Sequence, residues 1–105
     1  MPYIDAERRK RIDAAARDLA AAIILEHNKI DHGGNGEAAC LTTKAGLLNY
    51  AITTLILRTM GDIKYWKIAL LTGVLENVKQ ELYRRMASPY EDKKCAENGD
   101  VYGQP

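Results

Sequence analysis

Basic and aromatic side chains concentrate in one stretch of the chain. Lys79, Tyr83, Arg84 and Arg85 lie within two turns of a segment with helical spacing. A guanidinium group binds phosphate oxygens through two parallel hydrogen bonds, and aromatic rings attract cations. This combination suits a ligand that carries both a phosphate and a base. The sequence therefore predicts a ligand-binding site with these candidate residues: Asn49, Tyr50, Lys79, Tyr83, Arg84, Arg85 and Tyr90.

A structural interpretation of the same cluster is also open. The two tyrosines would pack the corner between successive helices. Arg84 and Arg85 would then pair with Glu81 and Glu91. Glu81 and Arg85 lie four residues apart, with the acid on the N-terminal side, which is the better order for an ion pair on a helix.

The acidic residues do not form a catalytic pattern. Small helical hydrolases of nucleoside triphosphates hold magnesium with Glu-x-x-Glu repeats, whereas Glu76 is followed by Lys79 and Gln80. The carboxylate ligands that magnesium needs are therefore missing. Neither Cys40 nor Cys95 has an obvious base nearby in the sequence to activate a thiolate. We expect the protein not to be an enzyme.

A metal site is not favoured either. The candidates are His27, Asp31, His32 and Cys40, and their spacing, with glycines between them, does not match a structural zinc site. We expect no metal and no cofactor.

The chain start and the apolar runs predict a cytoplasmic protein. The segment Met1–Asp5 has no apolar core of a signal peptide. No apolar run approaches the ~20 residues that span a bilayer. We therefore expect no membrane contact and reduced thiols at Cys40 and Cys95.

The overall charge argues against nucleic acid as a partner. Fifteen basic and fourteen acidic residues give a net charge of +1. The cluster Arg8–Arg11 is the one run of basic side chains that could contact DNA, which makes a DNA-binding accessory role a second alternative function. A solvated helix face explains the same cluster more simply.

Periodicity predicts a single helical domain over residues 1–105. Helices are expected at about 5–27, 43–60, 63–87 and 89–97, with Asp5 as the first N-cap. A flexible glycine-rich loop should occupy 28–42, because its glycines cannot hold a helix. Ser88, Pro89 and Glu91 form a helix-start signature, which predicts a break near Ser88. Gly99 should end the last helix.

The third helix carries an apolar seam with spacings of three and four residues, close to a heptad repeat. The apolar seam consists of Ile68, Leu71, Leu75, Val78 and Leu82. The short connection at Gly61 and Asp62 predicts that the second and third helices are antiparallel neighbours. We expect an all-α, small antiparallel bundle of three main helices and a short C-terminal helix, completed by homo-oligomerisation through helices one and three.

Several fragments together resemble one protein family. They are LNYAIT at 48–53, GVLENVKQELYRR at 73–85, PYEDKK at 89–94 and ENGDVY at 97–102, with the start MPYI. The set resembles a family of short uncharacterised proteins of bacteriophages and prophages. The resemblance implies a phage setting, in the host cytoplasm, and implies no reaction.

Two functions follow as hypotheses. The first is a non-enzymatic oligomer that binds a small phosphorylated or nucleotide ligand, as helical phage proteins do when they sequester an immune signal of the host. This hypothesis rests on analogy of size and helicity. The alternative is a protein–protein interaction module that binds and masks a host factor, with Ser88–Tyr102 as its recognition element.

Overall fold

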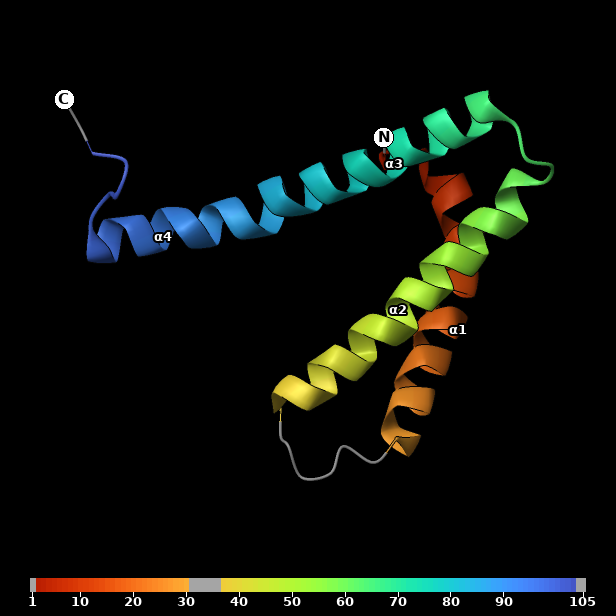
Figure 1. Cartoon of the computed structure of the whole chain (residues 1–105), viewed down its shortest axis with the longest axis horizontal. Coiled ribbons are helices and arrows are strands. Elements are labelled where there is room, and N and C mark those ends of the chain that lie inside the picture. Colours follow the sequence, from red (N-terminus) through yellow and green to blue (C-terminus); the bar gives the residue numbers. More distant parts are fainter. Residues whose placement is uncertain (1, 31–36, 104–105) are drawn as a thin grey trace. The chain divides into compact units, whose positions relative to one another are not determined.

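Helices make up almost all of the described chain. The structure is a computed structural model that describes residues 2–30 and 37–103. Figure 1 shows the helices, which are α1 Ala6–Lys29, α2 Glu37–Met60, α3 Tyr65–Leu82, the π-helix η1 Tyr83–Ala87 and α4 Ser88–Asn98. The described residues contain no strand. The predicted all-α fold is confirmed.

The first helix begins as its capping residue predicts. The side chain of Asp5 accepts a hydrogen bond from the backbone N–H of Arg8 at 3.0 Å. This bond satisfies one of the N–H groups that the first turn of a helix leaves without an internal partner. The helix continues to Lys29, slightly beyond the predicted end, and Ile30 turns the backbone to an extended conformation.

The second helix begins earlier than predicted. It starts at Glu37, and α1 ends at Lys29. Both predicted bounds of the loop, 28 and 42, are therefore wrong, because the two helices extend into that range. The segment from Glu37 to Ala39 favours a helix because alanine has the highest helix propensity. The glycines at 33, 34 and 36 lie outside the described residues.

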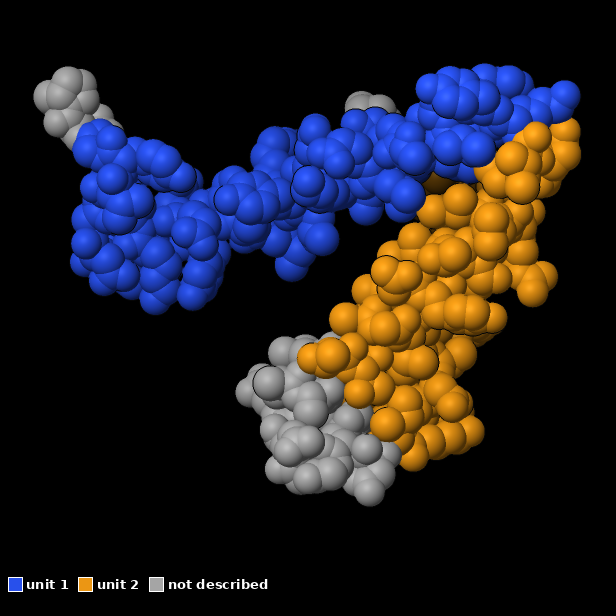
Figure 2. Space-filling model, in the orientation of Figure 1, with its two compact units in different colours: residues 1–2, 64–105 blue, residues 3–63 orange. Residues whose placement is uncertain are grey.

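The chain divides into two compact units, which Figure 2 shows in orange and blue. One unit comprises residues 3–63, in which α1 and α2 pack side by side in opposite directions. The other comprises residues 1–2 and 64–105. Because α2 and α3 belong to different units, their antiparallel pairing, the bundle and the single domain stay predictions.

Little of either unit is buried. Among the described residues, Ala51 and His27 are the ones below a tenth exposed, at 5% and 7%. Large apolar side chains on every helix remain 37% exposed or more, whereas the core of a compact domain buries most of them. The described residues therefore keep many large apolar side chains in contact with water.

The predicted break at Ser88 is wrong. Ala87 and Ser88 both have right-handed helical backbone angles, so α3, η1 and α4 form one continuous helical run. Pro89 lacks an N–H group, and its ring would clash with the carbonyl four residues earlier in a regular α-helix. The π-helical turn η1 lies directly before it and widens the helix there. A proline that often starts a helix is here accommodated inside one.

The two ends of this run differ in their caps. Lys64 is the N-cap of α3 and has no capping hydrogen bond from its side chain. At the other end Gly99 has φ of 93°, and its N–H donates to the carbonyl of Cys95 at 2.8 Å. A positive φ favours glycine, so the predicted C-cap is confirmed.

Candidate functional site

The predicted site residues are divided between the two units. Asn49 and Tyr50 lie on α2, in the unit of residues 3–63. The other members lie on the continuous helical run of the second unit, at Lys79, Tyr83, Arg84, Arg85 and Tyr90. A single site containing all of these residues stays a prediction.

Glu81 binds both arginines of the predicted cluster. The Arg84 guanidinium contacts both carboxylate oxygens of Glu81, with Nη2–Oε1 at 2.6 Å and Nε–Oε2 at 3.3 Å. Arg85 Nε lies 3.8 Å from the same Oε1. The pairing of both arginines with Glu81, which the structural interpretation includes, is confirmed, and their pairing with Glu91 stays a prediction. Two guanidinium groups share one carboxylate, which leaves an excess positive charge at this point.

Lys79 makes a looser contact. Its ammonium lies 3.6 Å from a carboxylate oxygen of Glu76, and both side chains are more than half exposed. Glu76 also accepts a hydrogen bond from the Gln80 amide at 3.3 Å. Exposed ion pairs of this kind contribute ~0–1 kcal/mol to stability, so Lys79 is held only weakly by Glu76.

The tyrosines are exposed on the surface. Tyr83 and Tyr90 are 59% and 58% exposed, and the helix corner in which we expected them to pack does not form. The Lys94 ammonium lies 5.7 Å from the centre of the Tyr90 ring, a cation–π distance. On α2, Tyr50 is 73% exposed. The Asn49 carbonyl accepts a hydrogen bond from the Thr53 hydroxyl at 2.8 Å.

Tyr50 also lines a shallow hollow between α1 and α2. The hollow measures about 280 Å³, and its walls include Leu19, Ile23, Glu26 and Thr54. No basic side chain lines it, so it offers no group to hold a phosphate.

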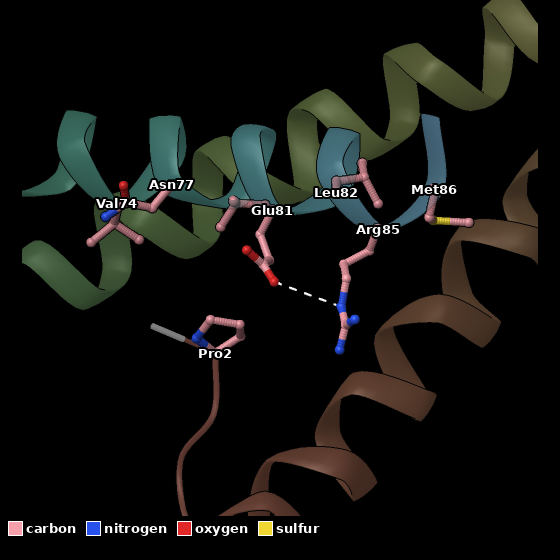
Figure 3. A pocket seen from close by; sticks show the side chains of 8 residues that line it. Pro2, Val74, Asn77, Glu81, Leu82, Arg85 and Met86 are labelled. Atoms are coloured by element: carbon pink, nitrogen blue, oxygen red, sulfur yellow. Dashed lines mark ion pairs between the residues drawn. The ribbon is translucent and has the colours of Figure 1, made fainter. Parts of the chain in front are cut away.

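A larger groove lies along α3 and η1, and sequence reasoning did not predict it. Figure 3 shows the groove, which has a volume of about 490 Å³. Most of its wall is apolar. It is lined by Pro2, Val74, Asn77, Val78, Glu81, Leu82, Arg85 and Met86. The spacing of four residues between Val74, Val78, Leu82 and Met86 was a signal for this wall. No pattern in the sequence indicated that Pro2 lines this groove, because its position depends on a contact between residues far apart in the chain.

The apolar seam lies on the same helix and is open to solvent. Ile68, Leu75, Val78 and Leu82 are 42%, 41%, 58% and 58% exposed. In the described part of their unit, which is Pro2 and residues 64–103, no second helix covers them. Large exposed apolar surfaces on soluble proteins are characteristic of sites of protein contact.

The basic cluster near the start of α1 is partly neutralised. Within Arg8–Arg11, Arg8 lies 3.5 Å from a carboxylate oxygen of Asp5, and Lys10 lies 3.4 Å from one of Glu7. These local pairs match the interpretation of the cluster as a solvated helix face.

The residues considered for metal binding are only partly described. Asp31, His32 and the side chain of Cys40 lie outside the described residues, while His27 lies in the last turn of α1. Over the described ranges, no three His, Cys, Asp or Glu side chains gather closely enough to hold a metal ion. None of the described helices is both long and apolar enough to cross a membrane.

A family model for a domain of unknown function, DUF6899, matches residues 1–101. The chain belongs to this family. Among curated proteins and solved structures, none matches the chain. The DUF6899 match covers α1, α2, the whole helical run from α3 to α4, and the cap at Gly99. The expected membership in a family of uncharacterised proteins is confirmed.

The DUF6899 chain thus offers two kinds of surface on one helix. The first is an apolar face, formed by the seam and the groove, which suits another protein chain. The second is a polar edge at Glu81, where two arginines and one carboxylate present hydrogen-bond donors to solvent. The first is the larger, and it has no covering helix in its own described unit.

Proposed function

We propose that this chain is a non-enzymatic protein-binding module that works as a homo-oligomer, with the apolar seam of α3 as its contact surface. The supporting observation is the exposure of Val78 and Leu82, each 58% exposed at heptad-like spacing on a helix without a covering neighbour in its described unit. Covering a large aliphatic side chain contributes ~1.5–3 kcal/mol, so water contact along this face is costly.

A helix with the same spacing is the natural cover for such a seam. Two helices whose apolar residues recur at spacings of three and four wind around each other, and the apolar side chains of each helix insert between those of its partner. A helix that does not pack against other structure gains little stability from propensity alone, because most helical stability in proteins comes from burying one face. A second copy of α3 supplies both the spacing and the apolar surface.

Native mass spectrometry of the purified protein tests the proposal. It reports subunit number and retained small molecules in the same spectrum. We expect an oligomer that persists at micromolar protein concentration. A monomer under all concentrations up to about 100 μM, where even weak specific interfaces associate, would overturn the proposal.

The family motifs suggest a phage setting, and in that setting the same module would bind and mask a host protein. The exposed segment at the end of α4, with Val101 and Tyr102 90% and 93% exposed, is the recognition element for such a partner. Capture of one stoichiometric host protein, lost on deletion of residues 100–105, which leaves α4 and its cap in place, is the expected result.

A small phosphorylated ligand is the second candidate. The observation in its favour is the sharing of Glu81 between Arg84 and Arg85, since two guanidinium groups with one carboxylate retain donors for phosphate oxygens. Isothermal titration with a panel of nucleotides tests it. Arg84→Ala and Arg85→Ala should each weaken binding, and unchanged affinity in both variants would exclude this site.

A further inference from the structure

We infer that the interface with the second copy does not end with α3 but crosses the π-helical turn and includes Met86 and Tyr90. This inference rests on the homo-oligomer proposed above and extends its contact surface. It makes α4 part of the self-association interface.

The register of the helix determines which residues follow Leu82 on the apolar face. In an uninterrupted α-helix the spacing of the seam would continue from Leu82 to Arg85 and then to Pro89. Neither residue suits an apolar interface. A π-helical turn accommodates one additional residue, which moves every later side chain back by one position around the helix. The positions that follow Leu82 on the seam are therefore occupied by Met86 and Tyr90.

The hydrogen bonding and the groove agree with this register. The backbone N–H of Ser88 donates to the carbonyl of Tyr83, five residues earlier, which is the bond of a π-turn. Met86, within that turn, lines the same groove as Val78 and Leu82 from α3, and the ion pair of Glu81 and Arg85 forms the polar part of its wall (Figure 3). One apolar face thus continues across the change in helix type.

The area required by a stable dimer favours the longer face. A standard interface covers roughly 800 Å² on each partner, of which roughly 450–520 Å² is apolar. The exposed parts of the five seam residues supply roughly 200–250 Å² if a buried aliphatic side chain covers ~60–120 Å². Met86 and Tyr90 add roughly 150–200 Å². Only the extended face approaches the size that a specific interface needs.

Charge also fits a second copy as the occupant. Residues 65–98 contain six basic and five acidic side chains, so two identical helices do not repel each other strongly. A strongly basic or acidic helix would instead require a partner of opposite charge. The balanced composition and the repeated spacing both favour self-association.

Two tyrosines with nearly equal exposure provide a matched test. Tyr90 lies on the extended seam, whereas Tyr83 lies on the same helical run, about a quarter turn off the seam. Their exposed fractions are 58% and 59%. We would measure the dissociation constant of the oligomer by sedimentation equilibrium for Tyr90→Glu and Tyr83→Glu.

Tyr90→Glu should raise the dissociation constant by at least about tenfold, because a buried aromatic contact is replaced by a charge. Tyr83→Glu should change it by less than about threefold, as a surface substitution does. Met86→Gln, which keeps an unbranched side chain, should shift the constant in the same direction as Tyr90→Glu. Circular dichroism establishes that each variant keeps its helix content.

The outcomes separate this inference from the proposed function. Equal effects of the two tyrosine variants, or a larger effect of Tyr83→Glu, would overturn the extension across the π-turn. If Leu75→Glu dissociates the oligomer while Tyr90→Glu and Met86→Gln do not, the interface ends with α3 and the proposed function stands. A monomeric wild-type protein overturns both.

Discussion

The backbone N–H of Ser88 donates a hydrogen bond to the carbonyl oxygen of Tyr83, five residues earlier in the helix. This bond widens one turn directly before Pro89, the residue that a regular helix could not accommodate there. The same turn moves Met86 and Tyr90 onto the apolar seam. The proline therefore influences the face that the protein presents as well as the path of its backbone.

Replacing Pro89 tests the link between the π-turn and the interface. Pro89→Ala restores a backbone N–H and removes the ring, so η1 can relax to a regular α-helix. Met86 and Tyr90 then rotate off the seam, and we expect the oligomer to weaken by about tenfold. Sedimentation equilibrium measures the change.

A compensating deletion provides the control for this prediction. Removing Arg84 in the Pro89→Ala background takes out one residue and returns Met86 and Tyr90 to the seam of a regular helix. Arg85 then stands three residues after Glu81, so an ion pair with the spacing of Arg84 is retained. Association should return to within about threefold of the wild type. A double variant that remains as weak as Pro89→Ala would contradict the account.

Glu81→Gln tests the role of the shared carboxylate. The exposed guanidinium groups of Arg84 and Arg85 lose their anionic partner, but the free energy of unfolding should fall by at most about 1 kcal/mol because these pairs lie near solvent. If the arginines also bind a phosphorylated ligand, its affinity should rise in this variant. Urea unfolding and nucleotide titration measure the two effects.

A nucleotide affinity that falls in Glu81→Gln, instead of rising, would contradict this prediction. Nucleotide binding that weakens in this way would show that the carboxylate supports the ligand instead of competing with it. Asp92→Asn, on the same helical run and without a described ion pair, is a control for the change in net charge.

Asp5→Ala removes the cap of α1. The carboxylate accepts the Arg8 backbone N–H at 3.0 Å, and loss of such a cap lowers the free energy of unfolding by about 1 kcal/mol. Asp13→Ala, within α1 and away from its end, should cost less. Urea unfolding followed by circular dichroism compares the two. Equal losses would mean that the cap contributes no more than an ordinary surface acid.

Local signals predicted most of the helices correctly. Asp5 and Gly99 fix helix ends through bonds within a few residues, and both act as expected. The combination of Ser88 and Pro89 led to the wrong prediction of a helix break, because the same residues can begin a helix or follow a widened turn within one. Which outcome occurs depends on whether the preceding segment, Tyr83–Ala87, relaxes into a π-turn.

The candidate site was less predictable for a physical reason. The pairing of Arg84 with Glu81 follows from spacing along one helix. The groove at Pro2 depends on a contact between the start of the chain and α3, which periodicity does not encode. The seam was visible in the sequence, but its exposure was not, because spacing identifies an apolar face without showing what covers it.

The most direct test of the homo-oligomer compares two leucines of α3. Leu75 lies on the apolar seam, while Leu70 lies off it and is 61% exposed. Sedimentation velocity of Leu75→Glu and Leu70→Glu at equal concentration measures assembly. We expect Leu75→Glu to dissociate the oligomer and Leu70→Glu to leave it intact. An oligomer that survives Leu75→Glu, or that both variants disrupt equally, would contradict the apolar seam as the contact between subunits.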